Sequence, residues 1–173
     1  MPVKGTYVET LSRLKDHAGD KPLWVDLKSR QLRIKGYGVP PFTEITLTHN
    51  ISVDTPVTAY FDDGKEKATV LEVDGNRLIM QEGPKRVVGP AESINIMHPS
   101  LKIEGFLTKT DEQYIEASKL TGNVHYMLSF VECKQDVEML CTYHPEAVIV
   151  AKIESMKGLR YALHEWDGEA RLM

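Results

Sequence analysis

The sequence contains few of the features that mark several large classes of protein. Only two of its 173 residues are cysteine, which is too few to staple a chain of this length, so we expect both thiols to be reduced. No run of 18 apolar residues occurs and the first residues do not form a secretory leader, which together predict a cytoplasmic protein without a membrane span. There is also no nucleotide-binding loop, nucleophile elbow or base-reading module, and we therefore expect no cofactor.

Charge is unevenly distributed along the chain. The net charge is −4, yet residues 1–40 carry eight Lys and Arg against four Asp and Glu, while residues 41–173 carry thirteen against twenty-one. A basic beginning on an acidic remainder suits contact between subunits or with a protein partner of mixed charge. It does not suit a broad phosphate-binding surface.

A three-strand antiparallel meander is the clearest structural signal. The turns Asp63-Gly64 and Asp74-Gly75 suit tight hairpins, because glycine adopts positive φ without steric cost. The runs around these turns are rich in β-branched and aromatic residues and are Val57–Phe61, Lys67–Val73 and Arg77–Met80. Together with short strands expected near 44–48, 93–96 and 101–104, they predict a small barrel or sandwich.

Helices are predicted at two places, residues 6–18 and 110–120. Thr6 and Glu9 have the spacing of a capping box at the first, and Thr110 with Gln113 has it at the second. Strands are then predicted at Val124–Glu132, Val137–Thr142, Ala147–Ile153 and Leu159–Trp166, with a helix over 135–143 as an open alternative. We expect these strands to form a second antiparallel set.

The predicted fold class is α+β, mainly antiparallel β, with a barrel-like or sandwich-like lobe, a second antiparallel β set and two short helices. The length fits a single domain over 1–173. The glycines and prolines of 36–41 cannot continue a central strand, so we place a joint there. The expected sub-lobes are 1–40 with a helix and a basic hairpin, 41–108 with the meander, and 109–173 with a helix and antiparallel strands.

Cysteine and histidine gather in one part of the sequence. The cluster consists of His125, Cys133, Cys141 and His144, of which only the last two have the close spacing of structural zinc ligands. Apolar neighbours favour buried thiols instead, since unpaired cysteine behaves as a small hydrophobic residue. We therefore predict that neither cysteine forms a disulfide or binds a metal.

A hydrolase is kept as an alternative on the basis of histidines and carboxylates. His98-Pro99-Ser100 resembles one half of the paired His-x-Ser/Thr signature of two-histidine phosphoesterases. The second half is missing, because Ser52 comes one residue too late after His49 and would point to the opposite face of a strand. Carboxylates at 62–63 and 111–112 are explained by turn chemistry and by the first turn of a helix.

The most basic segment is a predicted hairpin, in which Leu23–Leu27 and Gln31–Lys35 flank a polar turn. Interface anchors are enriched in Trp, Tyr and Arg, and cations beside an aromatic ring also suit single-stranded nucleic acid. We predict a binding surface there and assign no catalytic residue. Its members are Trp24, Lys28, Arg30, Arg33, Lys35 and Tyr37.

These patterns favour a non-enzymatic protein-interaction module over an enzyme. Such a module would act as an assembly component or a regulator, including one of viral or mobile-element origin, through a protein partner or self-association. The alternatives are a nucleic-acid or nucleotide-binding β-barrel protein and a small hydrolase that uses histidine and carboxylates. No membrane partner is expected.

Overall fold

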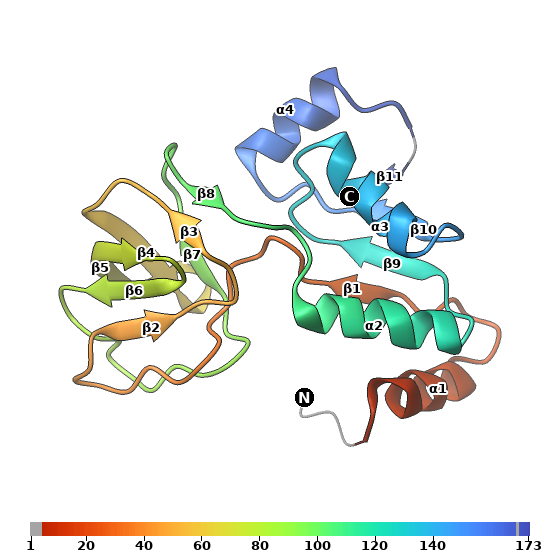
Figure 1. Ribbon diagram of the computed structural model, residues 1–173, viewed down its shortest axis with the longest axis horizontal. Helices are drawn as coiled ribbons and strands as arrows, with labels where there is room; N and C mark the ends of the chain where they lie inside the picture. The colour runs from red at the N-terminus through yellow and green to blue at the C-terminus, as the bar shows by residue number, and fades with distance from the viewer. Residues whose placement is uncertain (1–4, 169) are drawn as a thin grey trace. The chain divides into compact units, whose positions relative to one another are not determined.

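The computed structural model describes residues 5–168 and 170–173, and its internal contacts divide the chain into two compact units (Figure 1). Unit 1 comprises the residues up to Arg30 together with 107–173, and unit 2 comprises Gln31–Phe106. Unit 1 is therefore discontinuous in sequence, because all of unit 2 is inserted after its first strand. The division falls at Arg30 and Gln31 rather than in the glycine and proline segment 36–41, where Gly38 pairs with Val88 inside unit 2.

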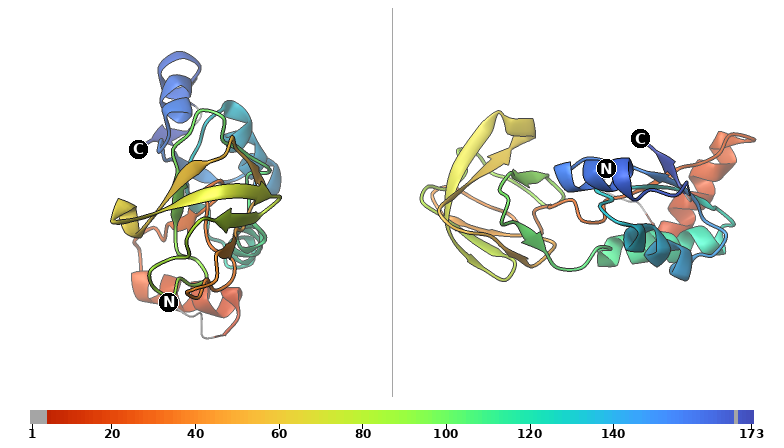
Figure 2. Two further views of the ribbon diagram at one scale, coloured as in Figure 1. Left: turned by 90° about the vertical axis from the view of Figure 1, so that its left-hand side faces the viewer. Right: turned by 90° about the horizontal axis from the view of Figure 1, so that it is seen from above.

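Unit 2 is built on a curled antiparallel sheet of five strands in the order β2-β6-β5-β4-β7, with a separate antiparallel pair, β3-β8 (Figure 2). The strands are β2 Glu44–Thr46, β3 Ile51–Ser52, β4 Val57–Phe61, β5 Glu66–Asp74, β6 Arg77–Met80, β7 Ile94–Ile96 and β8 Lys102–Ile103. The predicted meander is confirmed as β4, β5 and β6. Alternate residues of β4 are buried, as the period of two in a strand requires, and Phe61, Leu78 and Ile94 lie in the resulting core.

The two turns of the meander differ in detail. Gly75 lies between β5 and β6 with a positive φ of 58°, as the Asp-Gly signal predicts. Between β4 and β5 the chain forms a short 3₁₀ segment, Asp62–Gly64, in which both aspartates also have positive φ. The first connection is therefore longer than a two-residue hairpin loop.

Unit 1 contains a four-stranded sheet whose order, β1-β9-β10-β11, follows the chain. The strands are β1 Val25–Leu27, β9 His125–Leu128, β10 Val148–Ala151 and β11 Arg171–Leu172. Every neighbouring pair is parallel, so the prediction of a second antiparallel set is wrong. Parallel strands need crossover connections, and a strand order that follows the chain is that of consecutive βα units in (β/α) barrels.

Four α-helices accompany this sheet: α1 Tyr7–Ala18, α2 Lys109–Leu120, α3 Lys134–Tyr143 and α4 Met156–His164. The two predicted helices are confirmed as α1 and α2. Thr6 and Glu9 form the expected capping box on α1, whereas α2 is capped by Thr108 and Asp111 instead of Thr110 and Gln113. The mixed α and β class is thus confirmed, with antiparallel sheets in unit 2.

The other two helices occupy segments that were predicted as strands. Val137–Thr142 lies inside α3, which agrees with the alternative prediction of a helix over 135–143. A helix suits this segment because Val137 and Leu140 lie three residues apart and are buried together on one face. Most of Leu159–Trp166 lies in α4, where Ser155 accepts a hydrogen bond from the amide of Gly158 and caps the helix. Both helices are the crossovers that the parallel strands need.

The predicted basic hairpin does not form. Val25–Leu27 pairs in parallel with Tyr126–Leu128 in unit 1, whereas Arg33 and Ile34 form bridges with Ser93 and Leu47 in unit 2. Pairing with a distant strand replaces the local pairing, because it buries Val25 and Leu27 in the core of unit 1. Within the described residues, no helix is long and apolar enough to cross a membrane.

Candidate active site

Polar side chains follow three of the parallel strands on one face of the sheet. The register aligns Asp26, Met127 and Val150 across β1, β9 and β10. Residues two positions further on share that face, so the next level consists of Lys28, Ser129 and Lys152, each just beyond the end of its strand. The opposite face is apolar and buried, with Leu27, Leu128 and Ala151 at its last level.

Asp26 is the centre of this group. One carboxylate oxygen, Oδ1, lies 2.9 Å from the ammonium of Lys152 and accepts a hydrogen bond of 3.3 Å from the hydroxyl of Ser129. The other oxygen, Oδ2, pairs with the ammonium of Lys28. Groups from the ends of three strands therefore converge on one carboxylate.

A second carboxylate borders the same lysine. Glu154 Oε2 lies 3.9 Å from Lys152 Nζ and accepts a hydrogen bond of 3.1 Å from the amide of Phe130. The side chain of Lys152 is only 18% exposed, whereas those of Asp26 and Glu154 are about a third exposed at 34% and 35%. The lysine is thus shielded from solvent and its charge is balanced by two carboxylates.

The charged neighbours keep Asp26 ionised. Burial alone would raise the pKa of the Asp26 carboxyl, but hydrogen bonds from Lys28 and Lys152 outweigh burial and hold that pKa below its usual value. The stabilisation from this carboxylate is therefore complete above the unfolded-state pKa and is lost as the pH falls through the lowered value. At neutral pH Asp26 is an anion that fixes the two lysines and not a proton donor.

A more buried ion-pair network lies beside this group. Arg30 donates to both carboxylate oxygens of Asp136, at 2.8 and 2.6 Å, and to the carbonyl of Phe130 at 3.2 Å. Glu132 lies 3.4 Å from Arg30 and accepts a hydrogen bond of 2.8 Å from the hydroxyl of Ser155. The network joins the segment after β1 to the segments after β9 and β10.

The six residues of the predicted binding surface fall in both units. In unit 1, the Trp24 ring meets His125 edge to face at 4.9 Å, Lys28 pairs with Asp26 and Arg30 is held by Asp136. In unit 2, Arg33 donates to the carbonyl of Ala91 and to Gln31, while Lys35 is exposed and Tyr37 is 74% exposed. Because the hairpin does not form, no common element brings the six residues together.

The histidines that could support a hydrolase have separate partners. His98 Nδ1 lies 2.8 Å from the hydroxyl of Ser100, and the buried His144 lies 2.7 Å from the hydroxyl of Tyr126. His49 is in unit 2, with Thr48 3.2 Å from its Nδ1 atom. The described residues contain no group of three or more His, Cys, Asp or Glu side chains placed to hold a metal ion.

The amide of Cys133 donates a hydrogen bond of 3.3 Å to Asp136, in the ion-pair network beside the candidate site. No disulfide joins Cys133 and Cys141 in the described part of the chain. Burial and then the nearby Asp136 carboxylate raise the pKa of the Cys133 thiol, which disfavours the thiolate. Cys133 is therefore poorly suited to act as a nucleophile.

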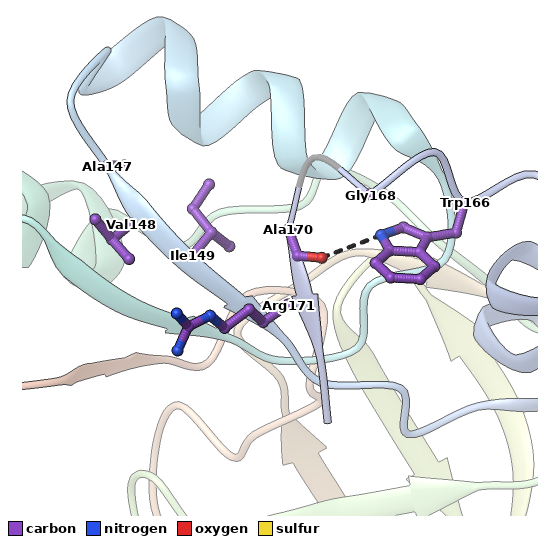
Figure 3. Close-up of a pocket in the computed structure, with 7 residues that line it drawn as sticks. All are labelled: Ala147, Val148, Ile149, Trp166, Gly168, Ala170 and Arg171. Carbon is purple, nitrogen blue, oxygen red and sulfur yellow. Dashed lines mark hydrogen bonds between the residues drawn. The ribbon is translucent and has the colours of Figure 1, made fainter.

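An open pocket of about 460 Å³ lies at the opposite ends of the strands (Figure 3). It is lined by Val148 at the start of β10, by Arg171 at the start of β11 and by Trp166, whose indole donates a hydrogen bond of 3.1 Å to the carbonyl of Ala170. Among the described residues that line it, Arg171 is the one that is ionisable. These residues offer a flat ring and one cation but no group of converging polar side chains.

Sequence comparison adds no relative from which a role could be inferred. No known protein family matches the chain, and no curated protein matches it significantly. The candidate site therefore rests on geometry alone. Its members Asp26, Ser129, Lys152 and Glu154 were missed in the sequence, where each stands as a single polar residue in or just after an apolar run.

Proposed function

We propose that unit 1 carries the active site of an enzyme that binds a small anionic substrate at the carboxyl ends of β1, β9 and β10. The observation that supports this proposal is the convergence of Lys28, Ser129 and Lys152 on Asp26. In sheets of consecutive βα units, active sites lie at the carboxyl ends of the strands, where residues from several strands meet.

Each charged residue has a separate role in this proposal. Lys152 contacts an oxygen of the substrate, because an ammonium has three donors, of which one faces Asp26 at 2.9 Å while Glu154 lies 3.9 Å away. Asp26 holds Lys152 and Lys28 in place. Glu154 lies 3.9 Å from the Lys152 ammonium and helps to balance its positive charge. A shielded lysine stabilises developing negative charge more strongly than a lysine in water does.

Replacing Lys152 by methionine is expected to weaken anion binding at least tenfold, because the ammonium that contacts the anion is removed while most of the apolar stem is kept. We would follow backbone amide chemical shifts during titration with inorganic phosphate and, separately, with acetate. In the wild type, the shifts should centre on residues 28–30, 129–132 and 152–154. A Lys119→Met variant, which removes an exposed lysine of α2 paired with Glu116, should titrate like the wild type. Equal titration of Lys152→Met and the wild type would refute the site.

A second candidate function is self-association, and the surface of α4 favours it. This helix exposes an apolar stripe of Met156, Leu159 and Leu163, which are 70%, 43% and 68% exposed. At 100° per residue, the exposed Lys157, Arg160 and His164 form an adjoining basic stripe. Only Gly158 and Tyr161 of α4 are buried, so most of the helix surface is available to a partner.

We propose that α4 of one copy of the chain docks against α3 of a second copy. That helix exposes Met139 and Tyr143, which are 39% and 43% exposed, beside the exposed carboxylate of Glu138. Glu112 accepts a hydrogen bond from the Tyr143 hydroxyl at 3.2 Å and adds a second negative charge. An apolar and acidic surface thus complements an apolar and basic one.

Replacing Leu163 by glutamate is expected to shift the chain toward monomer, because a charge then enters the apolar stripe. Molar mass would be measured by light scattering after gel filtration, over a range of protein concentrations. Leu120→Glu is the matched control, since Leu120 is also 68% exposed but lies on α2. An Arg160→Glu variant should also be shifted toward monomer, and adding Glu138→Lys to it should restore self-association. A wild type that stays monomeric at every concentration rules out this candidate.

A further inference from the structure

One buried carboxylate holds the turn that follows β1. Asp111 is only 3% exposed and lies in the first turn of α2. Its Oδ1 atom accepts a hydrogen bond of 2.9 Å from the amide of Lys28, and its Oδ2 atom accepts one of 3.0 Å from the amide of Ser29. A residue of α2 therefore fixes the backbone from which the Lys28 side chain extends.

The same carboxylate also completes the capping box of α2. Oδ2 accepts hydrogen bonds from the amide and the hydroxyl of Thr108, at 2.8 and 2.7 Å. A capping box needs only the reciprocal bonds between its two members, so the bonds to Lys28 and Ser29 go beyond helix capping. Four donors thus meet on one side chain. Few side-chain groups other than a carboxylate could accept four hydrogen bonds.

The backbone at this turn needs such support. Ser29 is completely buried and has a φ of 48°, in the left-handed region, which is unfavourable for a residue with a Cβ atom. Strained conformations of this kind persist where the surroundings impose them. The hydrogen bonds that Asp111 accepts from the amides of Lys28 and Ser29 hold Ser29 in this conformation.

We propose that Asp111 is a positioning residue of the candidate active site, which fixes the Lys28–Ser29 turn so that the Lys28 ammonium reaches Asp26. The inference deepens the proposed function and rests on it for the catalytic role of the site. The link from Asp111 through Lys28 to Asp26 can be tested without a substrate. Asp111 itself touches no reacting group and acts only through Lys28.

The pKa of Asp26 can be used to test this link, because Lys28 is one of the neighbours that set it. Lys28 faces it from the turn after β1, Lys152 from the end of β10 and Ser129 from the end of β9, while Glu154 lies beyond Lys152. Both lysines lower the pKa of Asp26. Displacing Lys28 must therefore raise that pKa, whereas loss of the negative charge of Asp111 would by itself lower it.

The test is the Asp111→Asn variant. Its side-chain NH₂ group is a donor, and it replaces one of the two oxygens that accept hydrogen bonds from the backbone amides of Lys28 and Ser29. Titration of the Asp26 carboxyl carbon, followed by nuclear magnetic resonance, should show its pKa rise by about 1 pH unit relative to the wild type. Thr108→Val, which removes one donor to Asp111 and keeps the carboxylate, should give a smaller rise in the same direction. This milder variant also keeps the test decisive if Asp111→Asn does not fold.

Asp136→Asn is the matched control. Asp136 occupies the same position in α3, is 2% exposed and accepts hydrogen bonds from Arg30 and the amide of Glu132. Its replacement should destabilise the fold and leave the titration of Asp26 unchanged. An unchanged Asp26 titration in the folded Asp111 or Thr108 variant, or an equal change in Asp136→Asn, would overturn the proposal.

If phosphate fails to bind the wild type while Asp26 still responds to Asp111→Asn, the proposed function fails and the positioning link stands.

Discussion

Replacing Arg30 by methionine is expected to lower the free energy of unfolding by about 3–5 kcal/mol, because the buried carboxylate of Asp136 then loses its counter-ion. The side chains of Arg30 and Asp136 are only 14% and 3% exposed, and two parallel hydrogen bonds join them. Urea denaturation followed by tryptophan fluorescence measures the loss in unit 1, since both tryptophans, Trp24 and Trp166, belong to that unit.

An exposed ion pair of the same unit provides the control. Lys134 and Asp167 lie 2.7 Å apart with side chains 39% and 40% exposed. Exposed pairs contribute about 0–1 kcal/mol, so Lys134→Met should lower the free energy of unfolding by no more than that. Equal losses in the Arg30 and Lys134 variants would show that burial of the Arg30 pair has no energetic consequence.

The second large effect is expected in unit 2, where Phe61→Ala should cost about 3–5 kcal/mol of stability. Phe61 is 1% exposed at the end of β4, so its removal leaves a cavity in the core between the strands. Hydrogen exchange of the amides in β4, β5 and β6 should accelerate accordingly. Phe42→Ala is the matched control, because Phe42 belongs to the same unit and is 71% exposed. It should change stability by no more than about 0.5 kcal/mol, and exchange that is equally fast in both variants would contradict the assignment of Phe61 to the core.

Local signals predicted the parts of the fold that local interactions determine. The capping residues Thr6 and Glu9 act within one turn of α1, and the turn at Gly75 joins two strands that pair directly. In contrast, β1 pairs with β9 about a hundred residues later, and nothing near Val25 indicates so distant a partner. A hairpin with the adjacent Gln31–Lys35 run was the nearest local solution, and it was wrong.

The candidate site escaped sequence analysis for the same reason. Asp26, Ser129 and Lys152 come together only if three strands are parallel and in one register. A signal was nevertheless present, because Val148–Ala151 is a continuous apolar run, which favours a strand of a parallel sheet. Lys152 follows this run directly, and Ser129 likewise follows Tyr126–Leu128, which in a parallel sheet predicts a common edge.

The insertion of unit 2 between β1 and α2 affects the order in which unit 1 can assemble. The β9-α3-β10 segment is continuous in sequence, so its contacts close a short loop and can form early. Docking of β1 against β9 must instead close a loop that contains the whole of Gln31–Phe106, at a greater cost in chain entropy. Prior folding of unit 2 reduces this cost, because a folded insert replaces many flexible residues with one compact body. A folded unit 2 therefore lowers the chain-entropy cost of bringing the strand that carries Asp26 against β9.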